Sequence, residues 1–234
     1  MQFYDLHVHT ENLEETIKMA KLLGMTGIGL ITNWIDHEEL EGFKRQVEPF
    51  KKEIDIAVGV EIKDKAQNVV RIAKQIRKDV ELILVHGGDL EVNRAAVETA
   101  EVDVLVHPEA KDPSQELRQD SGLDQVMVKL AKKNGVLIEF SLNDVIYSYK
   151  KTRSSILKSL LQNAKLVKKY KAPFVITSGS WSPWNMRAAS DLLSFGKYLG
   201  FQDPEIKKSF SGSKLFENKK RLSGKWVMPG VEVV

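Results

Sequence analysis

The chain of 234 residues contains no cysteine, which excludes disulfide bridges, thiolate zinc sites and cysteine nucleophiles. It has no uncharged apolar run long enough to cross a bilayer, so we expect no membrane partner. Its first residues lack the basic start and the apolar stretch of a secretory signal peptide. Together these absences predict a cytoplasmic protein whose stability comes from a packed core.

Short apolar segments alternate with longer amphipathic ones along the first 200 residues. We expect strands at 3–9, 27–33, 54–62, 80–86, 102–108, 136–142 and 172–180. Helices are expected at 13–24, 36–50, 66–78, 91–99, 123–135, 152–170 and 185–200. Seven such units predict a single α/β domain, a TIM-like (β/α)7 barrel with parallel strands. An open doubly wound sheet is the main alternative, but no glycine fingerprint follows the first strand.

The chain divides at about residue 202. We expect residues 1–202 to form the barrel, with a polar loop at 114–122. Residues 203–234 are basic and rich in glycine and serine, which predicts a short helix followed by a flexible arm.

The two ends of the chain differ in charge. Residues 150–234 contain 17 Lys and Arg against 5 Asp and Glu, a net +12, whereas residues 1–149 carry 18 against 27, a net −9. This asymmetry indicates a polyanionic partner on one side of the molecule. Chance clustering of solvated charge is the alternative.

Four of the five histidines end predicted strands, and so does one glutamate. Because the carboxyl ends of the strands open onto one face of a barrel, we expect these side chains to converge. Imidazole and carboxylate groups together are typical of a divalent metal site. The candidate metal ligands are His7, His9, Glu61, His86 and His107.

The same residues have a metal-free explanation. Glu61 would accept hydrogen bonds from His86 and His107 at a barrel rim, with no ion present. Pro108 predicts an extended backbone at His107 and the end of that strand.

This pattern resembles the PHP phosphoesterase superfamily, whose seven-stranded barrel carries up to three metals. The matches are the HxH motif in DLHVHT at 5–10, Glu61 after the third strand, and the histidines that end strands four and five. The chain departs from the family where Thr32-Asn33-Trp34 stands for T-D-H and Gly179-Ser180-Trp181 stands for D-x-H.

The resemblance implies a reduced metal content. One metal would use Glu61 and the two later histidines, all of which are present. A second would need the closing aspartate, which is Gly179 here, and we expect Trp34 and Trp181 to fill the third site. At most one divalent ion, zinc or manganese, is therefore expected. A hydrolytic centre needs metals on both the attacking and the leaving oxygen, so independent phosphoesterase activity is not expected.

The second half is also similar to a narrower family, the archaeal ribonuclease P protein component 3, related to the 30-kilodalton eukaryotic subunit. The similar segments are HPEAKDP, the run from LDQVMVKL to FVITSGS, and NMRAASDLLSFGKYLGF. The most specific matches are FSL-x-x-x-(I/L)YS and a TSG turn followed by R-x-x-x-DL-x-S(F/L)G. With the matching strand order upstream, the resemblance covers about residues 3–200.

This resemblance implies a subunit of an RNA enzyme that removes the 5′ leader from precursor tRNA. The chain itself would not be catalytic and would require no cofactor, because the RNA holds the catalytic magnesium. The implied partners are the ribonuclease P RNA, protein component 2, the other protein components and, within the complex, precursor tRNA.

A basic helix agrees with an RNA partner. Residues 150–171 contain eight basic residues and no acidic one, and the apolar residues lie on one face. A solvated helix face would more often carry acidic partners four residues away. The predicted RNA contacts are Lys150, Lys151, Arg153, Lys158, Lys165, Lys168, Lys169, Arg187, Lys219, Lys220 and Arg221.

Two further hypotheses remain open from the sequence. One is a metal-dependent phosphoesterase that keeps a single site. The other is a structural barrel that docks partner proteins, with an incidental basic face.

Overall fold

The computed structural model describes residues 2–109, 121–222, 226–228 and 231–232, with backbone alone for the last two segments. Most of the expected polar loop at 114–122 therefore lies outside the described residues, as do 223–225, 229–230 and 233–234 of the tail.

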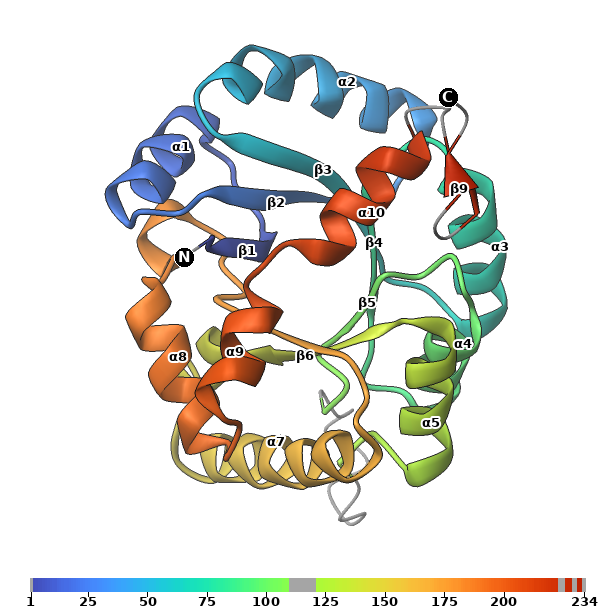
Figure 1. Cartoon of the computed structure of the whole chain (residues 1–234), viewed down its shortest axis with the longest axis vertical. Coiled ribbons are helices and arrows are strands. Elements are labelled where there is room, and N and C mark those ends of the chain that lie inside the picture. The colour runs from blue at the N-terminus through green and yellow to red at the C-terminus, as the bar shows by residue number, and fades with distance from the viewer. Residues whose placement is uncertain (1, 110–120, 223–225, 229–230, 233–234) are drawn as a thin grey trace.

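Within the described residues, seven parallel strands form one sheet in chain order, each followed by helical segments (Figure 1). The strands are β1 (Tyr4–Val8), β2 (Gly27–Asn33), β3 (Asp55–Ile62), β4 (Leu82–His86), β5 (Val104–Val106), β6 (Leu137–Ser141) and β7 (Phe174–Thr177). A parallel bridge between Val8 and Ser180 brings the first and last strands together, and the His9 amide donates to the Ser180 carbonyl at 2.7 Å. The predicted barrel is confirmed, and the open sheet is excluded.

The helices surround the sheet. They are α1 (Leu13–Leu22), α2 (His37–Val47), α3 (Ala66–Ile76), α4 (Leu90–Glu98), α5 (Gln125–Asn134), α6 (Leu142–Ile146), α7 (Lys150–Tyr170) and α8 (Ala189–Tyr198). Short 3-10 turns lie at Glu48–Lys52 and Pro183–Asn185. Asn12, Asp36, Asp89 and Asp124 accept hydrogen bonds from first-turn amides, which fixes four helix starts. None of the described helices is long and apolar enough to cross a membrane.

The helices differ from the sequence prediction most clearly after the sixth and the seventh strand. The sixth predicted strand is followed at once by α6, a single short helix that the sequence reading missed. The last predicted helix begins at Ala189 and not at 185, because Pro183–Asn185 forms a 3-10 turn and Met186 and Ala188 are extended.

The core has two apolar layers, as alternation along the strands requires. Inside the barrel, Tyr4, Leu6, Leu82, Leu84 and Val104 belong to one cluster. The other strand face packs against the surrounding helices in a larger cluster. Each strand thus turns one face to the barrel interior and the other to the surrounding helices.

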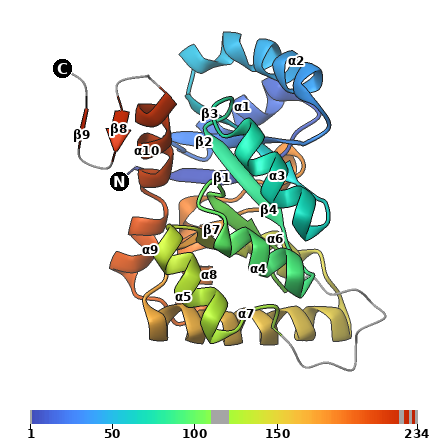
Figure 2. The ribbon, with the colours of Figure 1, turned by 90° about the vertical axis from the view of Figure 1, so that its right-hand side faces the viewer.

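The C-terminal segment packs on the barrel. Helix α9 (Asp203–Ser209) is followed by α10 (Ser213–Leu222), which crosses the end where the strands begin (Figures 1 and 2). Leu215 is fully buried in the barrel-interior cluster, and Asn218 donates to the Glu81 carbonyl at 2.7 Å. The expected flexible arm is therefore wrong for residues 213–222, because α10 closes the barrel floor. Beyond it, β8 (Trp226–Met228) pairs antiparallel with β9 (Val231–Glu232).

Candidate functional site

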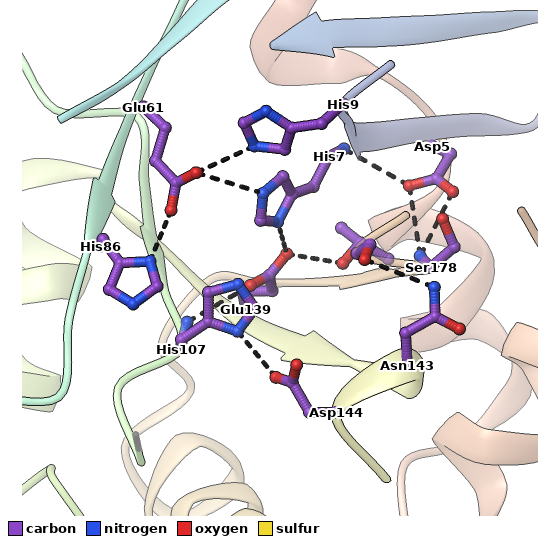
Figure 3. Close-up of polar contacts among 12 residues, drawn as sticks. Asp5, His7, His9, Glu61, His86, His107, Glu139, Asn143, Asp144 and Ser178 are labelled. Carbon is purple, nitrogen blue, oxygen red and sulfur yellow. Dashed lines mark hydrogen bonds and ion pairs between the residues drawn. The ribbon is translucent and has the colours of Figure 1, made fainter. Parts of the chain in front are cut away.

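The barrel mouth, where the strands end, brings together all five residues that the sequence singled out (Figure 3). They line a hollow of about 600 Å³. One oxygen of Glu61 lies 2.9 Å from His9 Nε2 and 3.9 Å from His7 Nε2. Its other oxygen lies 2.6 Å from His86 Nδ1. Glu61 is therefore the centre of the cluster.

The environment of Glu61 favours its ionised form. Burial alone would raise the pKa of Glu61, but the neighbouring His7, His86 and His9 hold that pKa far below its usual range. The carboxylate is therefore a permanent negative charge at the mouth.

Glu139 on β6 is a member of the site that the sequence reading missed. It accepts from His7 Nδ1 at 2.6 Å and from the Thr177 hydroxyl at 2.6 Å, and the His107 amide donates to it at 3.3 Å. Burial would raise the pKa of Glu139, but the attraction of His7 outweighs it and lowers the pKa to about 2. A glutamate inside the apolar strand LIEFS was the available signal, since such a charge is buried only with partners.

His7 lies between two carboxylates. Burial would lower the pKa of His7, but the charges of Glu139 and Glu61 raise it well above its ordinary value. Without a bound metal, His7 is therefore cationic at neutral pH and links Glu61 to Glu139, and it would release its Nε2 proton on binding an ion.

His107 makes a second ion pair, with Asp144 of α6. Its Nδ1 lies 2.7 Å from Asp144 Oδ2. Burial would lower the pKa of His107, but the charge of Asp144 raises it to about 9. The φ angle of His107 is +50°, so the extended backbone predicted from Pro108 is wrong. The contacts of its ring and its amide stabilise this left-handed conformation.

Glu109 completes the acidic side of the mouth. It is buried, and its Oε2 has no hydrogen-bond partner in the described structure. Burial, with the nearby charge of Asp144, raises the pKa of Glu109 to about 8. Glu109 therefore carries a proton at neutral pH.

Two groups of mouth residues could hold a divalent ion: His7, Glu61 and His107, or His107, Glu109 and Asp144. The first group lies around Glu61. His7, Glu61 and His107 each offer one ligand atom, and these atoms lie within 4.8 Å of one another. Glu139 and Asp144 hold the other ring nitrogens of the two histidines, as carboxylates do behind metal-bound imidazoles. The expected set of Glu61, His86 and His107 is thus changed, with His7 in the place of His86.

The positions where the chain departs from the metal-bearing pattern have distinct environments. A Cβ atom on Gly179, whose φ is +61°, would lie 2.3 Å from Ser141 Oγ, so a side chain there would be strained and would have to displace the Ser141 hydroxyl. Trp181 lines the mouth and packs edge-on against Tyr147 at 4.7 Å. Trp34 instead packs against His37 and the outer core. The expectation that both indoles fill a third metal site is therefore wrong for Trp34.

The comparisons with known proteins identify the family. Residues 2–222 match the family model described as RNase P subunit p30. The chain belongs to this family. Two relatives named ribonuclease P protein component 3 are similar over nearly their whole length. The one from Methanosarcina mazei is 31% identical and covers 100% of this chain and 96% of its own. The one from Methanococcus maripaludis is 34% identical and covers 94% of each.

A solved structure agrees with these relatives. A chain of a cryo-EM structure of archaeal ribonuclease P with mature tRNA superposes with a TM-score of 0.76. It is 26% identical and covers 97% of both chains. The resemblance to the component 3 family is confirmed.

In this p30-family chain the basic residues of α7 form an outward row. Lys151, Lys158 and Lys165 are seven residues apart and exposed, which puts them on one face of the helix. Lys150 and Lys169 are also exposed. Two other predicted contacts bond within the chain. Arg153 donates to the Ser148 carbonyl at 2.8 Å, and Lys168 donates to the Gly200 carbonyl at 2.9 Å.

The remaining predicted RNA contacts lie apart from this row. Arg187 is at the mouth rim, where it donates to the Met186 carbonyl at 2.8 Å and to the Tyr147 hydroxyl at 3.3 Å. Lys219 pairs with Asp55, and Arg221 donates to the Arg77 carbonyl at 2.8 Å, both at the barrel floor. Lys220, also on α10, is exposed. The predicted set is thus divided among the mouth rim, α7 and the floor.

Proposed function

We propose that this chain is the component 3 subunit of a cytoplasmic ribonuclease P, supporting RNA-catalysed removal of the 5′ leader from precursor tRNA. The observation that carries this proposal is the similarity to component 3 proteins over almost the whole of both chains. In the assembly, the chain contacts the ribonuclease P RNA and associates with component 2 and the other protein components. Precursor tRNA joins it within the complex, and magnesium is supplied by the RNA.

The chain by itself is non-catalytic under this proposal. The mouth offers two candidate ligand groups that share His107, one with His7 and Glu61 and the other with Glu109 and Asp144. Glu109 of the second group is protonated at neutral pH, and Gly179 supplies no carboxylate at the position of the closing aspartate. A single ion there would neutralise buried carboxylate charge and would polarise a bound oxygen. Hydrolysis of a phosphodiester generally needs both the attacking and the leaving oxygen to be held.

The row on α7 supports an RNA contact. The helix has 21 residues and none is acidic, so no carboxylate of the helix itself offsets the lysine charges along about 30 Å. Lysine ammonium groups in such a row neutralise phosphates and release counterions, which gives affinity without reading sequence.

Charge reversal on α7 is expected to weaken RNA binding. With Lys151→Glu and Lys165→Glu together, the affinity for the ribonuclease P RNA should fall by about tenfold or more, and the log–log salt slope should become shallower by about 2. The measurement is binding by filter retention across a salt series, followed by cleavage of precursor tRNA in the reconstituted enzyme.

Lys52→Glu with Lys78→Glu is the matched control, since both lysines are exposed and lie outside the basic half. It should leave affinity and slope unchanged. The complete particle should lose processing when this subunit is omitted, and the subunit alone should cleave nothing. Processing by the purified chain without RNA, at the rate of the complete enzyme, would contradict the proposed function.

A metal-dependent phosphoesterase is the second candidate, favoured by the ligand group at Glu61. We expect the purified chain to take up at most one equivalent of zinc or manganese. Glu61→Gln should weaken that binding at least about tenfold, because the central carboxylate charge is lost. Elemental analysis and calorimetric titration measure both. His37→Ala, which changes a histidine on α2 away from the mouth, should have no effect.

The phosphoesterase candidate makes a different prediction for activity. It requires the metal-loaded chain alone to hydrolyse a phosphodiester, and Glu61→Gln to abolish that hydrolysis. Metal-loaded protein without such activity would eliminate it.

A further inference from the structure

A second hollow lies at the opposite end of the barrel from the histidines. It has a volume of about 610 Å³ and lies where α5 and α7 end and where α9 connects to α10. Five lysines line it, and they are Lys132, Lys168, Lys171, Lys208 and Lys214. We call it the lysine hollow. Among the described residues, Glu205 is its one carboxylate.

The lysine charges are poorly compensated. Glu205 already accepts a hydrogen bond from the Gln202 amide at 2.8 Å. Lys132 and Lys168 donate to the carbonyls of Tyr170 and Gly200, which satisfies donors without neutralising charge. The described structure gives the ammonium groups of Lys171 and Lys208 no hydrogen bond or ion pair.

Lys214 has only a weak acidic neighbour. Its Nζ lies 3.8 Å from Asp103 Oδ1. That carboxylate is already shared, because Arg77 Nη1 lies 2.5 Å from Oδ2 and Asn218 donates to Oδ1 at 2.8 Å. The lysine hollow therefore keeps an excess of positive charge.

Capping of helix ends explains only part of this arrangement. Lysines near a helix C-terminus favour the negative end of the helix dipole, which accounts for Lys132 on α5, Lys168 on α7 and Lys208 in the last turn of α9. Lys214 lies in the first turn of α10, where the helix dipole disfavours a positive charge. Like charges gathered from separate elements repel one another, so a bound anion would stabilise the arrangement.

The floor of the hollow is apolar. Phe174 and Phe201 also line it, and their rings stack with centroids 4.0 Å apart and planes at 16°. Lysine binds phosphate as a compact point charge. An apolar aromatic floor under ammonium groups suits a sugar–phosphate chain more closely than it suits a free carboxylate.

We propose that the lysine hollow binds backbone phosphates of the ribonuclease P RNA. The inference rests on the proposed function and adds an RNA contact at the end of the barrel remote from the mouth. Helix α7 runs along one side of the molecule toward this end (Figure 2). Its outward lysines therefore continue into the hollow through Lys168 and Lys171, and an RNA strand along α7 would end there.

Charge reversal in the hollow tests the proposal. Lys171→Glu with Lys208→Glu should lower the affinity of the chain for the ribonuclease P RNA at least about tenfold and reduce the salt slope by about 2. Lys171→Gln with Lys208→Gln, which adds no repulsion, should give a smaller loss in the same direction. Both lysines are exposed, so the thermal unfolding temperature should be unchanged in either variant.

The matched control is Lys133→Glu with Lys207→Glu. These lysines are exposed neighbours of Lys132 and Lys208 and do not line the hollow. Salt at physiological concentration screens surface charges over about 8 Å. The RNA affinity of this control variant should therefore stay near that of the unmodified chain.

Several outcomes would overturn the inference. In the first, the unmodified chain binds the RNA and the Lys171 and Lys208 variants bind it with the same affinity and the same salt slope. This result would leave the proposed function intact. In the second, the same variants bind the RNA normally but no longer associate with component 2. This result would assign the hollow to an acidic segment of a partner protein. Failure of the unmodified chain to bind the RNA would overturn the proposed function as well.

Discussion

Asp103→Ala is expected to lower the free energy of unfolding by about 3–5 kcal/mol. Asp103 precedes β5 and is 2% exposed. It pairs with Arg77 at 2.5 Å and accepts hydrogen bonds from the Ile83 amide and from Asn218 of α10, both at 2.8 Å. Without the carboxylate, a nearly buried guanidinium loses its counter-charge and two donors lose their acceptor. Urea denaturation monitored by circular dichroism measures the loss.

The same substitution should loosen the barrel floor. Asn218 is one of the polar anchors of α10, so we expect limited proteolysis to cut faster within Ser213–Leu222 than in the unmodified chain. Asp79→Ala is the control, since Asp79 is partly exposed and lies 3.7 Å from His37. Its cost should be below about 1 kcal/mol. A cost of that size for Asp103→Ala would contradict the role assigned to this network.

The stability of the metal-free protein is expected to fall as the pH rises from about 6.5 to 9. The folded-state pKa of His107 is about 9, above its unfolded value of 6.5. Its contribution is therefore complete below pH 6.5 and is lost as the pH rises through 9. At about 1.4 kcal/mol per pH unit for each proton, His107 alone accounts for roughly 3 kcal/mol. The raised pKa of His7 acts with the same sign.

Glu109 adds to this trend from a lower pH. Its folded-state pKa is about 8, against 4.5 when unfolded. The folded chain keeps a proton that the unfolded chain has released, so stability declines from pH 4.5 and the cost is complete above pH 8. Urea denaturation at steps of half a pH unit, with a chelator present, should show the decline. Glu109→Gln should flatten it below pH 8. Constant or rising stability between pH 6.5 and 9 would contradict these assignments.

The sequence predicted the five mouth residues because strand ends are local features. Short apolar runs that end in a histidine or in Glu61 place those side chains at one end of a parallel barrel. Glu139 was missed because its position in an apolar strand indicates a buried charge but does not identify the partners of that charge. His7 and Thr177, which make it tolerable in an apolar strand, are 132 and 38 residues away.

The tail was misread for a related reason. Weak periodicity in a basic segment indicates low intrinsic order, yet Leu215 fills the barrel floor and Asn218 bonds to the Asp103 network. Tertiary burial outweighed the poor local signal, as it commonly does for helices.

The sequence by itself determined the strand order, the barrel, five of the residues at its mouth and the family, because these follow from periodicity and from motifs a few residues long. Only the tertiary structure decided that His7 joins Glu61 and His107, that Trp34 turns to the outer core, and that lysines from four helices surround one hollow. These groupings depend on how strands and helices separated by many residues pack against one another. Spacing along the chain assigns a side chain to a face of an element, and packing alone selects its neighbours.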